Sequence, residues 1–426
     1  MKNFPLTRRG ALAASVAATL PWGTDRLAAG PADSLPPVRQ ITQGPLHHWF
    51  GYYDKLQFDP SNRFVLAGQV PFEHRTPTAD DVIRIGMVDT QENDRWIPLG
   101  KTNAWGWQQG CMLQWRPGSE SEIVWNDRQD DAHVCRVMDV KTKELRTLPR
   151  PIYALSPDGK FAITADFSRI QRMRPGYGYV GLSDPCAEQR APEDSGVWKM
   201  DMNTGESQLI FSLADAARIP YRGKTRADQW HYFNHLLISP DASRFIVLHR
   251  WRRSTGEGDA AQPSGPFTTR MFTVAMDGSD RYVLDPSGKT SHFIWRDPKH
   301  ICAWTRPEGK RDAFYLFEDQ TDRVEVVGER VMTVNGHNTY VPNTDNEWIL
   351  NDTYPQGERQ EQVPYLYHIP SNRKVVLGRF PSPPSYTGEW RCDTHPRTSN
   401  DGESVVIDSA HSGGRQLHLI DISGIV

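Results

Sequence analysis

Several features that would indicate the class of a protein directly are weak or absent in this 426-residue sequence. Its formal charge is only −3, with 49 basic against 52 acidic side chains and no basic stripe, so nothing in it calls for nucleic acid or an anionic membrane as a partner. Its five cysteines are odd in number, scattered and without a Cys-x-x-Cys pair. This argues against a disulfide framework, and we expect small buried thiols instead.

The sequence also lacks a long apolar run and a long amphipathic helix. The segment Ala11–Leu20 is too short to span a bilayer as a stable anchor, and Leu213–Arg218 predicts at most a short helix. We therefore expect no membrane anchor. Most of the chain shows period-two alternation interrupted by Asn, Asp, Gly and Pro, which is typical of antiparallel strands joined by tight turns.

Residues 1–30 are interpreted as a targeting segment. The stretch Thr7–Leu12, TRRGAL, resembles a twin-arginine signal, and the small residues Ala28–Gly30 offer a cleavage site. This predicts a bacterial protein that is exported folded to the periplasm or secreted. The mature domain would then be residues 31–426, which we interpret as one unit.

One hairpin design recurs seven times: a short apolar run, a Pro/Asp/Gly turn and a second apolar run. Its fullest copy is His231–Arg250, HYFNHLLISPDASRFIVLHR. The copies are about 57 residues apart, somewhat more than the ~40–50 of minimal propeller blades. A second pair of alternating strands recurs between these hairpins, which makes each repeat a four-stranded unit. The sequence therefore predicts an all-β fold, a seven-bladed β-propeller.

The last repeat is incomplete. It stops at QLHLIDISGIV, with no turn and no fourth strand. The extended segment Pro37–Gly44 precedes the first repeat and is a suitable donor. We predict that this N-terminal strand completes the last blade and closes the ring.

Four of the hairpins carry a histidine in the same position, five residues before the turn residue. Because the first strand of each propeller blade lines the central channel, these side chains should converge. Neutral imidazoles in a partly polar pocket suit a divalent metal, with Mn, Zn and Ca as candidates, and no organic cofactor is expected. The alternative is that they are structural histidines that join neighbouring blades. The four are His235, His292, His337 and His395.

The third hairpin, PIYALSPDGKFAITADFSR, carries a tyrosine and an arginine at its two ends. If its strands pair across the turn, Tyr153 and Arg169 lie side by side. A guanidinium lowers the pKa of an adjacent phenol and can bind a carboxylate through two hydrogen bonds. The pair would therefore suit proton abstraction next to a carboxylate.

Three connections are longer than a meander needs: 73–81, 167–195 and 380–394. Long structured loops in compact domains are commonly functional, and these carry aromatic and arginine side chains. We interpret them as binding loops, with packing flaps as the alternative. The residues expected to hold sugars are Arg172, Arg174, Tyr177, Trp390 and Arg391.

The Tyr153–Arg169 hairpin, the histidine-first hairpins and the strand WQQGCMLQW at 107–115 together resemble the seven-bladed propeller polysaccharide lyases, which include oligogalacturonate, ulvan and rhamnosyl-glucuronate lyases. The resemblance implies that Tyr153 transfers a proton and that Arg169 faces a uronate carboxylate. It also implies a manganese site in which His292, His337 and His395 are ligands.

The sequence departs from that resemblance at Gln108 and Gln109, where two of the branches have a catalytic histidine. Glutamine cannot exchange protons, so we expect these two side chains to contact substrate. Either His74, His48 or His47 then substitutes, or the chemistry differs, or the site binds without turnover.

The function predicted is β-elimination at a 4-linked uronic acid in a polysaccharide or oligosaccharide, by a monomeric enzyme. Loss of the C5 proton builds charge on the carboxylate, which an arginine or a metal would stabilise. Two alternatives stay open. A non-catalytic binding propeller would have no bound metal, and a glycoside hydrolase would need paired carboxylates, for which the candidates are Asp54, Asp127, Asp352 and Glu389.

Overall fold

The computed structural model describes residues 35–255 and 262–426. Residues Pro36–Val426 form one compact unit. The predicted twin-arginine segment, residues 1–30, lies outside the described residues. Among the helices that are described, none has the length and apolar character needed to cross a membrane.

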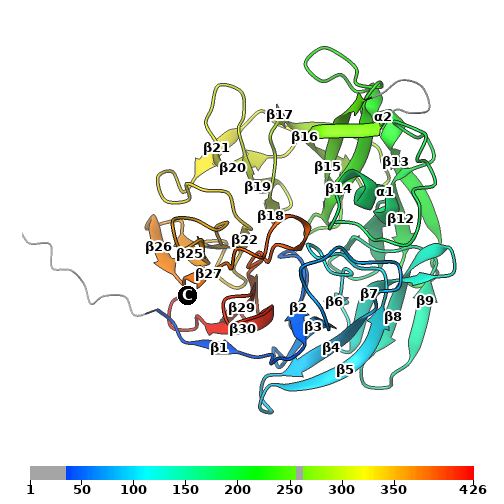
Figure 1. Ribbon diagram of the computed structural model, residues 1–426. Coiled ribbons are helices and arrows are strands. Elements are labelled where there is room, and N and C mark those ends of the chain that lie inside the picture. Colours follow the sequence, from blue (N-terminus) through cyan, green and yellow to red (C-terminus); the bar gives the residue numbers. More distant parts are fainter. Residues whose placement is uncertain (1–34, 256–261) are drawn as a thin grey trace, which may run out of the picture. The chain divides into compact units, whose positions relative to one another are not determined.

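The described part of this unit contains seven four-stranded antiparallel sheets, which follow one another in chain order around a common centre (Figure 1). The first three sheets are β2 (His47–Trp49), β3 (Phe64–Val70), β4 (Ile83–Asp89) and β5 (Arg95–Thr102); β6 (Gln114–Trp115), β7 (Glu122–Gln129), β8 (Ala132–Asp139) and β9 (Leu145–Leu148); and β10 (Ala154–Leu155), β11 (Phe161–Thr164), β12 (Gly196–Asp201) and β13 (Ser207–Ser212).

The next three sheets are β14 (Trp230–Ile238), β15 (Arg244–Thr255), β16 (Gln262–Ala275) and β17 (Tyr282–Gly288); β18 (Phe293–Asp297), β19 (His300–Thr305), β20 (Ala313–Glu318) and β21 (Val324–Val327); and β22 (Thr339–Tyr340), β23 (Trp348–Asn351), β25 (Tyr365–His368) and β26 (Arg373–Val376). The short strands β24 (Glu361–Gln362) and β27 (Phe380–Pro381) pair with each other, and two short helices, α1 (Phe167–Met173) and α2 (Leu213–Arg218), lie in connections.

The seventh sheet combines the two ends of the described chain. It contains β28 (Arg397–Thr398), β29 (Ser404–Ser409) and β30 (Gln416–Asp421), and its fourth strand is β1 (Val38–Gln40). The strand β1 pairs antiparallel with β30, with Val38 opposite Ile420. The prediction that Pro37–Gly44 donates the missing strand is therefore confirmed.

The inner ends of sheets that are distant in sequence touch one another. Tyr53, which follows β2, donates a hydrogen bond of 2.8 Å from its phenol to the carbonyl of Phe293 in the fifth sheet. The neighbouring Tyr52 lies 4.9 Å from the ring of His235 in the fourth sheet and 5.2 Å from that of His395 before the seventh. Such contacts arise when the first strand of each sheet faces a shared centre.

Apolar side chains fill the spaces between successive sheets. One cluster joins Val124 of the second sheet, Ile163 of the third and Val247 of the fourth, all without solvent exposure. All five cysteines are free and buried, as expected. Burial raises the pKa of Cys111 and Cys135 to about 12, so these thiols stay protonated.

Candidate active site

The four histidines in the repeated position lie at the centre of the unit and are 2 to 6% exposed. Two of them need an unusual backbone: φ is +54° at His235 and +37° at His395. Met112, in the same position of the second sheet, has φ of +57°. At His235 this conformation coincides with a break in strand register between Asn234 and Leu236. Bulges of this kind redirect a side chain and are common beside functional sites.

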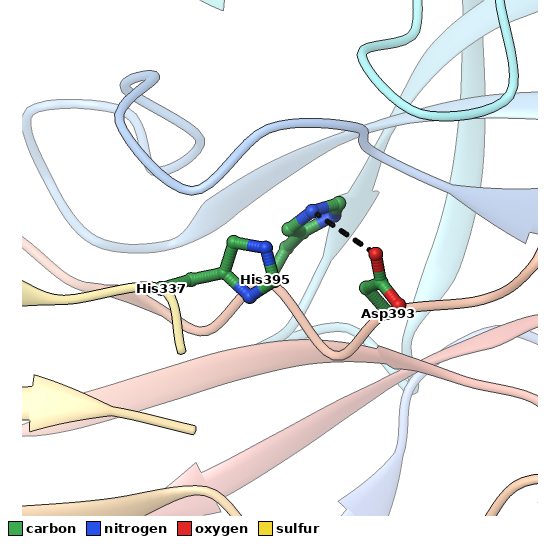
Figure 2. Close-up of side chains that lie close together, drawn as sticks. All are labelled: His337, Asp393 and His395. Atoms are coloured by element: carbon green, nitrogen blue, oxygen red, sulfur yellow. Dashed lines mark ion pairs between the residues drawn. The ribbon is translucent and has the colours of Figure 1, made fainter. Parts of the chain in front are cut away.

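Three acid and imidazole groups form a compact donor set. Ligand atoms of His337, Asp393 and His395 all lie within 4.8 Å of one another, and their side chains point toward each other (Figure 2). The ring of His292 lies 4.2 Å from that of His337. Asp393, two residues before His395 in the chain, is therefore a candidate ligand.

Hydrogen bonds orient two of these imidazoles. Nδ1 of His337 lies 2.9 Å from a carboxylate oxygen of Asp352, and Nδ1 of His292 lies 3.0 Å from the side-chain oxygen of Asn335. Each acceptor holds a proton on Nδ1 and leaves the Nε2 lone pair for a metal. Burial lowers the pKa of His292 and of His395 well below the usual range, so both are neutral.

A divalent transition metal fits this donor set. Asp393 has one carboxylate oxygen, Oδ1, that is buried and has no hydrogen-bond partner among the described residues. Neither ring nitrogen of His395 accepts or donates a hydrogen bond within the same part of the chain, and Nε2 lies 4.0 Å from Asp393 Oδ2. Imidazole and carboxylate donors of this kind suit manganese or zinc better than calcium, which prefers oxygen ligands only.

His235 is separate from this group, which corrects the prediction of four equivalent ligands. Its ring stacks on Tyr52 with an interplanar angle of 17°, and Tyr52 in turn contacts His395. Nδ1 of His235 lies 3.2 Å from the amide nitrogen of Gln109 and 3.3 Å from the phenol of Tyr153. The intervening Tyr52 ring is the physical reason why this imidazole faces different partners.

Tyr153 is fully buried and hydrogen-bonded. It accepts from Gln109 Nε2 at 2.8 Å and from the backbone N–H of His235 at 3.0 Å. Burial raises its pKa well above the usual range, with Asp54 adding to the shift. The expectation of a lowered phenol pKa at Tyr153 is therefore wrong.

Arg169 has a different role from the one expected. All five of its guanidinium N–H groups are used: Nε bonds the carbonyl of His231, and the two terminal nitrogens bond Asp184 and the carbonyls of Cys186, Gln189 and Arg190. Its side chain is buried, and none of these bonds reaches Tyr153. The residue lies in helix α1, which Asp166 caps, and it ties the 167–195 loop to the fourth sheet.

The tyrosine beside guanidinium groups is Tyr177. Arg391 donates from Nη2 to its phenol at 2.7 Å, and the guanidinium of Arg174 lies 3.6 Å over its ring. Burial opposes ionisation, but the charges of Arg174 and Arg391 outweigh it and lower the pKa of Tyr177 below the usual value. The ring of Tyr177 lies 5.9 Å from that of His235.

Arg174 and Arg250 bring positive charge to the same place. Both help to lower the pKa of His235, after burial, which is the largest cause. Nη1 of Arg174 is buried without a hydrogen-bond partner in the described chain. Burial lowers the pKa of Arg250 to about 10, so it remains a cation at neutral pH. Arg250 and Tyr52 were not predicted from the sequence, and neither was Tyr354, whose ring lies 6.1 Å from that of His292.

Other predicted residues hold loops in place. Gln108 donates to the carbonyls of Glu389 and Arg391, and Arg172 donates to that of Ala187. Trp390 donates to the carbonyl of Ser385. These contacts hold the 167–195 and 380–394 loops in place. The three side chains are not part of the donor set of His337, Asp393 and His395.

The histidines proposed as substitutes for the glutamines are also engaged elsewhere. His48 is buried between Gln416 and Gln69, at 2.9 and 2.8 Å. His74 is exposed, and its ring lies 4.7 Å from that of Tyr386. His47 pairs with Glu73 at 2.8 Å. None of the three contacts Tyr153 or His235 in the residues described.

The four carboxylates considered as candidates for a glycoside hydrolase pair each have another partner. Asp54 pairs with Lys55, Asp127 with Arg136, Asp352 with His337, and Glu389 with Thr76. They come from four different sheets or loops and are held in separate contacts. The arrangement does not favour hydrolysis by a carboxylate pair.

The chain matches no protein-family model and no curated protein. Among solved structures it is similar to an oligogalacturonate lyase from Vibrio parahaemolyticus, with a TM-score of 0.62, 14% identity, and coverage of 92% of this chain and 95% of that one. It is also similar to an oligogalacturonate lyase in complex with manganese, with a TM-score of 0.63, 14% identity, and coverage of 92% and 94%. At this identity the likeness shows that the chain shares their fold, which confirms the all-β propeller predicted from the sequence.

Proposed function

We propose that this chain is a lyase that cleaves a uronate-containing polysaccharide or oligosaccharide by β-elimination. The observation that carries the proposal is the separation of one buried neutral imidazole, His235, from the donor set of His292, His337, His395 and Asp393. Elimination next to a carboxylate needs these two parts: a base for the C5 proton and positive charge for the carboxylate. The shared fold with oligogalacturonate lyases supports the same reaction class.

The substrate carboxylate would face Arg174. Its guanidinium has a buried donor without a partner in the described chain, whereas every donor of Arg169 is used. With a divalent cation held by the histidines and Asp393, the site would also supply charge for the developing enolate. Such stabilisation is commonly the largest contribution to a rate of this type.

His235 is the proposed base. Burial and the charges of Arg250 and Arg174 lower its pKa well below the usual range, so the ring is unprotonated at neutral pH. Nδ1 of His235 lies 3.2 Å from the amide of Gln109 and 3.3 Å from the phenol of Tyr153, and Nε2 lies 3.3 Å from the phenol of Tyr52. Tyr153 and Gln109 would then orient His235 rather than accept the proton themselves.

Tyr177 is the proposed acid for the leaving oxygen. Its lowered pKa makes the phenol a better proton donor than Tyr153, and its ring lies close to His235. A positioned acid or base of this kind contributes roughly 10²–10⁴-fold to a rate. The same phenol joins the two loops through Arg391, so substrate entry would require this contact to open.

The reaction is tested by the ultraviolet absorbance of an unsaturated uronate product. The mature protein is offered a panel of uronic-acid polymers, with manganese and with chelator. Absorbance that rises, and that is lost in His235→Asn and in Arg174→Met, supports elimination at this site. New reducing ends without absorbance would indicate hydrolysis, and a folded protein with no product from any polymer would indicate a binding module.

A further inference from the structure

The fourth sheet carries a cavity that is separate from the histidines and Asp393 of the candidate active site. Its strands β15 and β16 are 12 and 14 residues long, whereas the innermost strand β14 has 9. The end of β15, the part of β16 from Ser264 to Thr268, the connection between α2 and β14, and the end of β17 line a space of about 1020 Å³. This volume is in the range of ligand-binding clefts.

Among the residues that the structure describes, five cationic side chains line this cavity, against one acidic side chain, Asp228. None of the five forms an ion pair within residues 35–255 and 262–426, whereas exposed arginines elsewhere, such as Arg63 and Arg95, pair with carboxylates. A concentration of unpaired charge is costly unless a counter-charge arrives, so it marks an anion-binding surface. The five are Arg190, Arg222, Arg226, Arg253 and Lys289, and we call the space they line the basic cavity.

The other lining groups suit a sugar chain. Hydroxyl groups come from Ser254, Ser264 and Thr268, and Phe267 offers a half-buried aromatic face. The guanidinium groups of Arg222 and Arg226 lie 5.3 and 5.6 Å from the ring centre of Tyr221, which restricts their movement.

Phe267 links the basic cavity to the candidate active site. The guanidinium of Arg252 lies 5.7 Å from its ring, and those of Arg250 and Arg174 lie 4.7 and 5.1 Å from the same ring. Arg174 is the group proposed to face the substrate carboxylate. Cations therefore continue from the cavity to the centre through Arg252, Arg250 and Arg174.

We propose that the basic cavity binds uronate units that flank the cleaved bond, so that the protein holds several anionic sugars of one chain at once. This inference rests on the proposed function, which supplies the uronate at the centre. The carboxylates along such a chain repeat, and the cations of the cavity and Arg174 offer several positive charges to them. Because the cavity is open to solvent, salt should weaken this binding.

The test removes the three exposed cations together, as Arg222→Ser, Arg253→Ser and Lys289→Ser. The control removes three exposed lysines that have no ion pair in the described chain: Lys101→Ser, Lys141→Ser and Lys299→Ser. Binding is measured calorimetrically with polygalacturonate, with dextran sulfate as a sulfate-bearing polymer, and with uncharged dextran. We expect the affinity for polygalacturonate to fall about tenfold in the cavity variant and less than about twofold in the control.

Equal affinities in the cavity variant and the wild type would overturn the proposal, and so would an equal loss in the control. Binding to dextran sulfate but not to polygalacturonate would overturn the uronate assignment. The binding measurement needs no turnover, so it separates the two proposals. If the wild type releases no unsaturated product but the cavity variant still loses affinity for polygalacturonate, the binding proposal is supported and the proposed reaction is rejected. If turnover is seen, KM for the polymer should rise about tenfold while KM for a di-uronate and kcat stay unchanged.

Discussion

Arg391 donates a hydrogen bond of 2.7 Å to the phenol of Tyr177 and joins two loops that are more than 200 residues apart in sequence. Burial raises the pKa of Tyr177, but the charges of Arg174 and Arg391 outweigh burial and lower the pKa below its usual value. The phenol–guanidinium pair expected at Tyr153 and Arg169 is therefore present at a different tyrosine. The two residues of this pair come from different loops, so only tertiary contacts bring them together.

Removal of the Tyr177 hydroxyl should impair turnover. Tyr177→Phe keeps the ring but loses the proton donor, so we expect kcat to fall by roughly 10²-fold or more in the absorbance assay. Tyr179→Phe is the matched control, since its phenol contacts Asn126 in the core. If both variants lose the same activity, Tyr177 is not the acid.

Substitution of Arg174 should affect activity, whereas substitution of Arg169 should affect stability. Arg174→Met is expected to abolish activity in a protein that remains folded. Arg169→Met leaves Asp184 buried without its nearest cation, and it should lower the free energy of unfolding by about 3–5 kcal/mol. Denaturant titration and the lyase assay on both variants distinguish the two roles. If the Arg169→Met protein were as stable as the wild type but inactive, Arg169 would have a role in the active site.

Asp352 should control metal affinity through His337. Asp352→Asn keeps the shape but weakens the acceptor for Nδ1, so manganese affinity should fall about 10–100-fold. The readout is the rise in unfolding temperature with added manganese, which depends on affinity and not on turnover. His411→Gln, at a histidine outside the cluster, should leave that rise unchanged. If added manganese did not change the unfolding temperature of the wild type, this would argue against the metal site.

Stability should fall as the pH drops from about 6.5 toward 4. Burial lowers the pKa of His133 and of His231 to about 4, so the unfolded chain, with a pKa near 6.5, binds protons first. Stability is therefore complete above pH 6.5 and is lost as the pH falls, by ~3 kcal/mol or less for each histidine at pH 4. In His231→Gln the free energy of unfolding should depend less steeply on pH. Parallel curves for the variant and the wild type would contradict the assignment.

Export is predicted to depend on the paired arginines near the start of the chain. Arg8→Lys with Arg9→Lys preserves the charge but removes the twin-arginine pattern. The precursor should then accumulate in the cytoplasm of a bacterial host, as measured by fractionation. Unchanged export would point to another route.

The four-stranded repeats and the donor strand could be predicted because their signals are local. Alternation along a strand and Pro/Asp/Gly residues at turns specify hairpins without knowledge of distant contacts. The segment Pro37–Gly44 was predicted as the donor because the last repeat lacked a fourth strand, and its residues Val38–Gln40 pair with His418–Ile420. The partners of Arg169 could not be predicted, since they are mostly backbone carbonyls of a loop whose path no pattern specifies.

The all-β repeat and the shared position of the four histidines within it could be derived from the sequence alone, because alternation and turn residues are local signals that recur along the chain. Only the tertiary structure decided that Tyr52 separates His235 from the other three and that Asp393 joins them. It also gathered five cations into one cavity in a chain of net charge −3 that has no basic stripe. The physical reason is that these groups come from separate loops and strands, whose proximity depends on packing between sheets and not on sequence spacing.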